Sequence, residues 1–257
     1  MSEICSAALL KYVNSGIVAH HPLTIPEYEF TLFTTLYRVE KNQNLKSAVL
    51  PHIIKMYQNY QSLDYFDLIY ALPEYNDITE LVQYKKEILN KLQKEQELLF
   101  DYIKSDDYGA GTYALLKKAK ISVLQEPEYF SEYIKEQLLY NLCEEKDYQK
   151  VDIAIYNFAR SFDYICLPRD QMKNVAKAIS NQQNENGSWG GEQGFFTPFA
   201  LMVLLQIYQK SNIDVVTALK LGFEYAFSNE NYLQYIGSVA MMQDMFCEME
   251  KNNLCQL

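Results

Sequence analysis

The 257-residue chain is poor in the residues that interrupt helices, with only nine glycines and seven prolines. So few breakers favour long helices over a β fold with many turns. No stretch of about 18 apolar residues occurs, which argues against a transmembrane helix. The first residues, MSEICSAALLKYVNSG, include Glu3 and only a short apolar core. We therefore expect an amphipathic helix there and no secretory signal.

Closely spaced cysteines and an excess of positive charge are absent as well. The five cysteines lie far apart and form no CxxC pair, which indicates reduced thiols in the cytoplasm. The net charge is -10, whereas a nucleic-acid-binding surface needs clustered lysine and arginine. We therefore expect a cytoplasmic protein without a nucleic-acid partner.

Apolar residues at helical spacing are abundant. In the segment 77–103 they recur every three or four positions, which predicts one long helix. Asp147 and Pro168 mark the starts of further helices, and Thr197 is predicted to be the N-cap of another. Because no alternating strand pattern of useful length occurs, we predict one all-α domain over residues 1–257 with about ten to twelve helices.

Two segments resemble each other, which indicates an internal repeat. When the residues around Tyr108 are laid on those around Trp189, Thr112 meets Thr197. In both segments a polar turn with an aromatic residue and a glycine precedes an apolar helix. The copies lie about 80 residues apart, which suits two helix-pair units of a helical array.

The lone tryptophan, Trp189, belongs to the sequence KAISNQQNENGSWGG, which begins at Lys177. Its spacing resembles the QW motif of the terpenoid cyclases, the group of squalene–hopene and oxidosqualene cyclases. These enzymes share an α/α toroid, a barrel of helical hairpins, with the prenyltransferase β-subunits. The resemblance implies this fold and structural roles for Gln183, Gly187 and Trp189. The glutamine amide suits unpaired backbone groups at helix ends, and the glycine permits a tight turn.

The catalytic motifs of these enzymes do not accompany the resemblance. Class II cyclases protonate an alkene with an aspartic acid of a DxDD motif, which is absent here. The nearest sequence is SDDYGAGTY, in which Asp106 and Asp107 stand side by side. Adjacent carboxylates can split their pKa values and leave one acid protonated, so these two residues are the candidate catalytic acids. An acidic turn before a helix N-terminus is the structural alternative.

Metal-binding motifs are incomplete too. The DDxxD motif that holds Mg²⁺ in class I terpene synthases is absent, and the sequence DYFD offers only Asp64 and Asp67. These two share a helix face and are the candidate Mg²⁺ ligands, with a solvated helix start as the alternative. Asp163 and Cys166 match part of the zinc site of protein prenyltransferases, but the histidine that should follow has no counterpart. We predict no other metal site.

Two functions fit these observations. The first is a terpenoid cyclase-like enzyme that acts on, or binds, an isoprenoid or another small apolar molecule in a central cavity lined by aromatic residues. The second is a non-catalytic helical module that binds a ligand or a protein, including one half of a two-subunit assembly or a homodimer. A closed aromatic cavity with an inward-pointing carboxylate would favour the enzyme.

Overall fold

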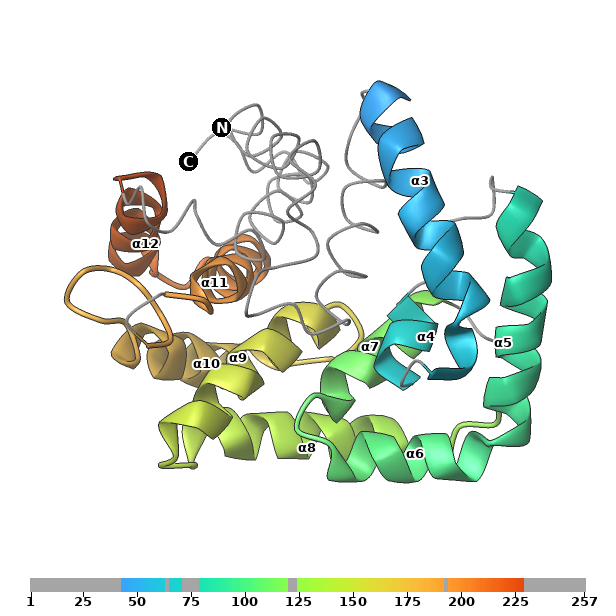
Figure 1. Ribbon diagram of the computed structural model, residues 1–257. Helices are drawn as coiled ribbons and strands as arrows, with labels where there is room; N and C mark the ends of the chain where they lie inside the picture. Colours follow the sequence, from blue (N-terminus) through green and yellow to red (C-terminus); the bar gives the residue numbers. More distant parts are fainter. Residues whose placement is uncertain (1–42, 63–64, 71–78, 120–123, 192–193, 229–257) are drawn as a thin grey trace. The chain divides into compact units, whose positions relative to one another are not determined.

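The computed structural model describes residues 43–62, 65–70, 79–119, 124–191 and 194–228 (Figure 1). All regular structure in these ranges is helical, which confirms the predicted all-α class. The elements are α3 (Gln43–Gln58), η2 (Tyr60–Ser62), α4 (Tyr65–Tyr70), η3 (Thr79–Leu81), α5 (Val82–Lys94), α6 (Gln96–Ser105), α7 (Gly109–Ala119), α8 (Phe130–Cys143), α9 (Tyr148–Ser161), α10 (Arg169–Asn181), α11 (Thr197–Ser211) and α12 (Val216–Ser228).

The described residues divide into two compact units. Unit 1 contains those up to Leu99, together with 118–119 and 124. Unit 2 contains Phe100–Lys117 and the described residues from Gln125 onwards. A single domain over residues 1–257 is still a prediction.

Unit 1 is held together by contacts among α3, η3 and α5. Its buried side chains include Ile53 and Tyr57 of α3 and Ile88 of α5. The rings of Tyr57 and Tyr84 have their centroids 6.4 Å apart, so an aromatic contact joins the two helices. Aromatic pairs of this kind add to the stabilisation from burial alone.

The long helix predicted over 77–103 is wrong in one respect, because it is interrupted at Glu95. Helix α5 ends at Lys94, and Glu95 adopts φ −105° and ψ 23° before α6 begins. The Glu95 carboxylate accepts a 2.9 Å hydrogen bond from the hydroxyl of Tyr65. Helical periodicity alone cannot reveal a contact with a residue so distant along the chain.

Unit 2 consists of helices packed in two layers (Figure 1). Helix α8 contacts α9 and α10, while α11 contacts α9, α10 and α12. The rings of Phe100 and Phe130, 5.0 Å apart, join α6 to α8. A hydrogen bond from the Gly111 N–H to the Asn157 side chain joins α7 to α9. Thus α6, α8 and α10 form one layer, and α7, α9 and α11 form the other.

The two layers differ in how much of each helix is buried. Helices α9 and α11 are buried on most sides, whereas α10 buries only the face of Val175, Ala176 and Ile179. The α7–α9–α11 layer is therefore the core of unit 2. Open helical arrays and closed toroids both stack helical hairpins in two layers. Closure into an α/α toroid is accordingly a proposal and not a finding.

The helix starts follow the sequence signals with one exception. The side chain of Asp147 accepts the N–H of Gln149 at 3.0 Å, which confirms it as the N-cap of α9. The prediction that Thr197 caps α11 is wrong, because the helix begins at Thr197 and its N-cap is Phe196. The Thr197 hydroxyl instead accepts the N–H of Trp189 at 3.1 Å, so it stabilises the turn that precedes the helix.

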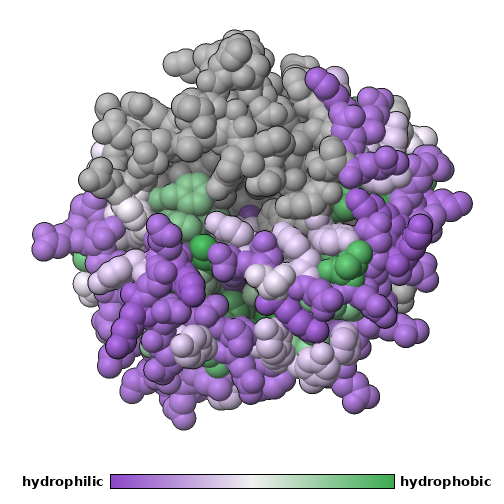
Figure 2. Space-filling view, turned by 60° about the horizontal axis from the view of Figure 1, so that its bottom comes forward, coloured by the Kyte–Doolittle hydropathy of each residue, from purple (hydrophilic) through white to green (hydrophobic). Residues whose placement is uncertain are grey.

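The surface of the described residues is mainly polar. On the face shown in Figure 2 hydrophilic residues dominate the coloured surface, and hydrophobic residues appear in small separate areas. Scattered apolar residues are normal on a protein surface and do not mark a docking site. None of the described helices is both long enough and apolar enough to cross a bilayer.

Candidate functional site

The candidate acids Asp106 and Asp107 lie in the turn between α6 and α7. The Asp106 carboxylate accepts the N–H of Tyr108 at 2.8 Å, and its carbonyl accepts the N–H of Gly109 at 3.0 Å. Asp106 therefore stabilises the turn that starts α7, as a capping side chain does. The Asp107 side chain is exposed. This geometry confirms the structural alternative for Asp106, and the catalytic role of both acids is untested.

The turn is anchored by Asn157, which sequence analysis missed. Its side chain is 3% exposed. The Nδ2 atom donates to the carbonyl of Asp107 at 2.7 Å, and Oδ1 accepts the N–H of Gly111 at 3.0 Å. One buried amide on α9 thus holds both sides of the helix start. A polar residue within the apolar run AIYNFA was the only signal in the sequence.

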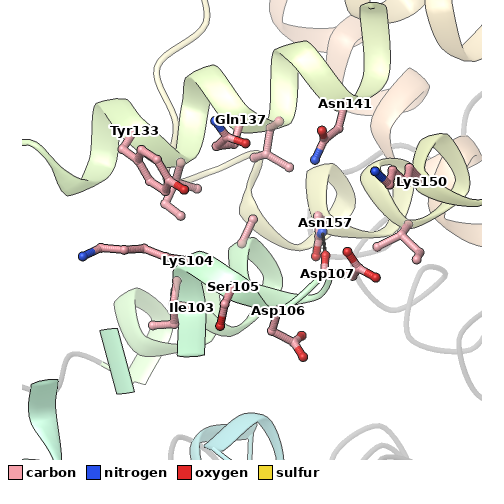
Figure 3. A pocket seen from close by; sticks show the side chains of 14 residues that line it. Ile103, Lys104, Ser105, Asp106, Asp107, Tyr133, Gln137, Asn141, Lys150 and Asn157 are labelled. Atoms are coloured by element: carbon pink, nitrogen blue, oxygen red, sulfur yellow. Dashed lines mark hydrogen bonds between the residues drawn. The ribbon is translucent and has the colours of Figure 1, made fainter. Parts of the chain in front are cut away.

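A pocket of about 210 Å³ lies beside this turn, between the end of α6, α8 and α9 (Figure 3). Its walls are mostly polar. They include Asp106 and Asp107 from the turn, Gln137 and Asn141 from α8, and Lys150 and Asn157 from α9. The structure therefore brings the two candidate acids into a pocket, but this pocket is open and polar, unlike the dry aromatic cavity expected of a cyclase.

A row of polar side chains on α8 forms one wall of the pocket. Tyr133, Gln137 and Asn141 follow each other at intervals of four residues and line it together (Figure 3). Residues four apart lie on the same helix face. The carboxamides of Gln137 and Asn141 make no hydrogen bond to any residue that the structure describes. Their i, i+4 spacing was visible in the sequence, but nothing there showed that they face a pocket.

Charges of both signs surround this row. Lys104 Nζ lies 3.7 Å from Asp101, and Lys150 Nζ lies 3.7 Å from Glu145. Backbone hydrogen bonds from the next two residues lower the pKa of Glu145, and its ion pair with Lys150 acts in the same direction. Because these ion pairs are long and at the surface, they leave both lysines able to turn towards a ligand.

Aromatic residues gather next to the turn and outside the pocket. The rings of Tyr108 and Tyr156 lie 5.3 Å apart, and those of Tyr156 and Phe199 lie 4.8 Å apart. The guanidinium of Arg160 lies over Tyr156 and Phe199, at 5.6 and 5.8 Å from the ring centroids. A cation of the protein itself therefore lies over two of these aromatic faces.

Gln183 and Gly187 of the QW-like sequence have structural roles. Gln183 Nε2 donates to the carbonyls of Gly187, at 3.0 Å, and Ala218, at 2.9 Å. It thereby ties its own turn to α12, but neither carbonyl is one of the unpaired helix-end groups that were expected: Gly187 lies in the turn, and Ala218 lies in the first turn of α12. Gly187 has φ +90°, and a Cβ there would lie 2.3 Å from the carbonyl oxygen of Leu221. Only glycine fits this position.

Trp189 also has the structural role expected of it. Its side chain is completely buried, and its indole N–H donates to the carbonyl of Ile179 at 2.7 Å. The indole packs against Gly222 of α12. In the resembling segment, the hydroxyl of Thr112 donates to the carbonyl of Tyr108 at 3.3 Å, whereas Tyr108 remains 38% exposed. In both segments a threonine hydroxyl bonds to the backbone of the aromatic residue, but Thr197 accepts whereas Thr112 donates, and only Trp189 is buried.

The candidate Mg²⁺ site is still a prediction, because Asp64 and the side chain of Asp67 lie outside the described residues. Within the described ranges, no group of three or more His, Cys, Asp or Glu side chains could hold a metal ion. Asp163, which was considered as a partial zinc ligand, is paired with Lys210 at 2.9 Å.

Comparisons with protein-family models, with curated proteins and with solved structures found no match to the chain. The resemblance to the terpenoid cyclases therefore depends on the QW-like sequence alone. The contacts of Gln183, Gly187 and Trp189 show how that sequence is used in this fold, and membership of a family is not established by them.

Proposed function

We propose that the chain is a non-catalytic helical module that binds a polar ligand in the pocket between α6, α8 and α9. One observation carries the proposal: the carboxamides of Gln137 and Asn141 line the pocket and have no described partner. Each carboxamide supplies two donors and one acceptor, so the pair offers a ligand a mixed hydrogen-bonding surface.

The surroundings of the pocket support binding more than catalysis. Asp106 already stabilises the turn by accepting the N–H of Tyr108, whereas protonation of an alkene needs an acid that donates its proton to the substrate. The pocket is open to solvent, and a general acid strong enough to protonate an alkene needs a dry cavity. A binding role needs neither condition.

Nuclear magnetic resonance tests this proposal directly. ¹⁵N-labelled protein is titrated with amino acids, capped dipeptides, monosaccharides and nucleotides, while the side-chain amide signals of Gln137 and Asn141 are followed. We expect one of these classes to shift both signals saturably, and Asn141→Ala to abolish its binding. Tyr140→Ala, an exposed neighbour on the same helix, serves as the control. Absence of saturable shifts at the two amides for every class would refute the proposal.

A terpenoid cyclase-like activity is the second candidate, favoured by the aromatic row beside the acids. Tyr108 follows Asp107 directly and contacts Tyr156, which contacts Phe199. Aromatic faces can stabilise a carbocation. Incubation with prenyl diphosphates and squalene, with and without Mg²⁺, followed by mass spectrometry, tests this candidate. A cyclised product lost in Asp107→Asn would favour the enzyme, and unchanged substrate would favour the binding module.

A further inference from the structure

The spacing of the polar row on α8 matches the repeat of an extended polypeptide. Gln137 and Asn141 are four residues apart, which corresponds to a rise of about 6 Å along the helix axis. In an extended chain, residues that face the same way recur every two positions, at about 6.6 Å. Consecutive side chains of the row can therefore reach the backbone of consecutive same-facing residues of a bound strand.

We propose that this pocket binds an extended polypeptide segment of a partner protein through its backbone, an inference that rests on the proposed function. The carboxamides of Gln137 and Asn141 each pair with the backbone of one residue of the strand, donating to its carbonyl and accepting from its N–H. A primary amide and an extended residue are complementary in this way, because the N–H and the carbonyl of one residue point towards the same edge of the strand. The hydroxyl of Tyr133 lies next in the row and extends the contact.

The size of the pocket limits what it can hold. Its volume of about 210 Å³ is below the range of drug-sized ligand sites, which begins at about 300 Å³. Two residues of an extended strand span about 7 Å, or one interval of the polar row. The pocket therefore binds only a short stretch of a longer chain. The residues before and after this stretch lie in solvent.

The charges in the pocket favour a peptide over a phosphorylated ligand. Lys104 lies towards the Tyr133 end of the row and Lys150 towards the Asn141 end (Figure 3). Asp106 and Asp107 line the same pocket, so the negative charge of a phosphate bound there would meet two carboxylates. A neutral backbone meets no such repulsion, and charged side chains beside the bound stretch can pair with either lysine.

Affinity selection from a peptide library tests the inference. A library of acetylated, amidated hexapeptides is incubated with the full chain, and bound peptides are identified by mass spectrometry. The test protein carries Gln137→Ala and Asn141→Ala. The matched control carries Glu136→Ala and Tyr140→Ala, an exposed pair at the same spacing on the same helix. Alanine is a good helix former, so both double variants should fold, as circular dichroism will verify.

We expect the natural sequence and the control to enrich the same peptides. The test protein should bind these peptides about tenfold or more weakly, because it loses several hydrogen bonds. N-methylation of alternate backbone nitrogens in an enriched peptide should weaken binding in one register and leave it unchanged in the other. Enrichment that ignores the Gln137 and Asn141 substitutions, or that survives N-methylation in both registers, would overturn the inference.

The two proposals can fail separately. If a monosaccharide or nucleotide shifts the amide signals of Gln137 and Asn141 while no peptide is enriched, the module binds a polar ligand and the peptide inference is wrong. If no class of ligand shifts those signals and no peptide is enriched, both proposals are wrong.

Discussion

The indole N–H of Trp189 donates a 2.7 Å hydrogen bond to the carbonyl of Ile179, close to the end of α10. The bond is completely buried, and the same indole packs against Gly222 of α12. One side chain in a turn thus joins the helix before it to a helix that follows later in the chain. The stability of this part of unit 2 should therefore depend on it.

Replacement of Trp189 should destabilise the protein, and the loss should be larger for alanine than for phenylalanine. Trp189→Phe keeps most of the apolar volume but removes the indole hydrogen bond from the Ile179 carbonyl, which retains only the N–H of Gln182 at 3.1 Å; this loss should cost about 0.5–1.5 kcal/mol. Trp189→Ala also leaves a cavity and should cost about 3–5 kcal/mol. Urea unfolding followed by circular dichroism measures both, with Tyr148→Ala, 74% exposed, as the neutral control. Equal stability of all three variants would refute the role of the indole.

Gly222→Ala should also be destabilising, although alanine is normally the better helix former. A Cβ at Gly222 would lie 2.6 Å from the Trp189 ring and 2.8 Å from Leu201. This overpacking should cost about 1–3 kcal/mol. Because phenylalanine removes the outer ring atoms of the indole, the penalty should shrink in a Trp189→Phe background. A double-mutant cycle measures this coupling, and strictly additive effects would contradict the contact.

Asn157→Ala should loosen the start of α7. It removes the hydrogen bonds to Asp107 and Gly111 and should cost about 2–3 kcal/mol. The free energy of opening at the Gly111 amide, measured by hydrogen exchange, should fall by the same amount. Asn141→Ala, which removes a carboxamide without a described partner, should change stability little. Similar losses in both variants would mean that Asn157 does not anchor the turn.

Asp106→Asn tests whether Asp106 stabilises the turn as a capping side chain. Asparagine keeps the Oδ1 acceptor for the Tyr108 N–H, so stability should change by less than about 0.5 kcal/mol, whereas Asp106→Ala should cost about 1 kcal/mol. The free energy of unfolding of both variants gives the answer. An asparagine variant as unstable as the alanine variant would rule out the capping role.

Asp152 on α9 should make stability depend on pH. Burial raises its pKa from 3.8 to about 6, so the folded state holds the proton more strongly than the unfolded state. The contribution of this group to the free energy of unfolding is therefore fully present below pH 3.8, and it is lost as the pH rises through about 6.

Asp152→Asn should accordingly stabilise the protein near pH 7.5 and have little effect near pH 4. The shift of about two pKa units corresponds to at most about 3 kcal/mol, and partial exposure reduces the expected gain to about 1–2 kcal/mol. Unfolding at both pH values measures it, and Glu136→Gln, at an exposed position on α8, is the control. A gain of the same size at pH 4 would contradict the ionisation of Asp152 as the cause.

Local sequence patterns were sufficient for the all-α class and for one N-cap, but they missed the interruption between α5 and α6. Asp147 is an N-cap because its side chain acts within two residues of itself, and such short-range signals are visible in the sequence. The QW-like spacing likewise implied a structural role for Trp189, whose side chain is completely buried in the structure. Thr197 was misplaced by one position because its hydroxyl serves the distant Trp189 N–H.

Only part of the candidate site could be predicted from the sequence. Asp106 and Asp107 were candidates because they are neighbouring acids, but the pocket that they line also includes residues from α8 and α9. Asn157 bonds to groups 46 and 50 residues away along the chain. No periodicity encodes such pairings, because they depend on how helices stack and not on how each one forms.

The stacking of α8 to α12 has a consequence for how the protein acquires its structure. Each of these helices packs on partners one or two places away along the chain, so the topology has low contact order. Any adjacent pair can serve as a nucleus on which the next helix condenses. We therefore expect α8 to α11 to associate during synthesis before α12 is complete, so that the core of unit 2 forms by local steps.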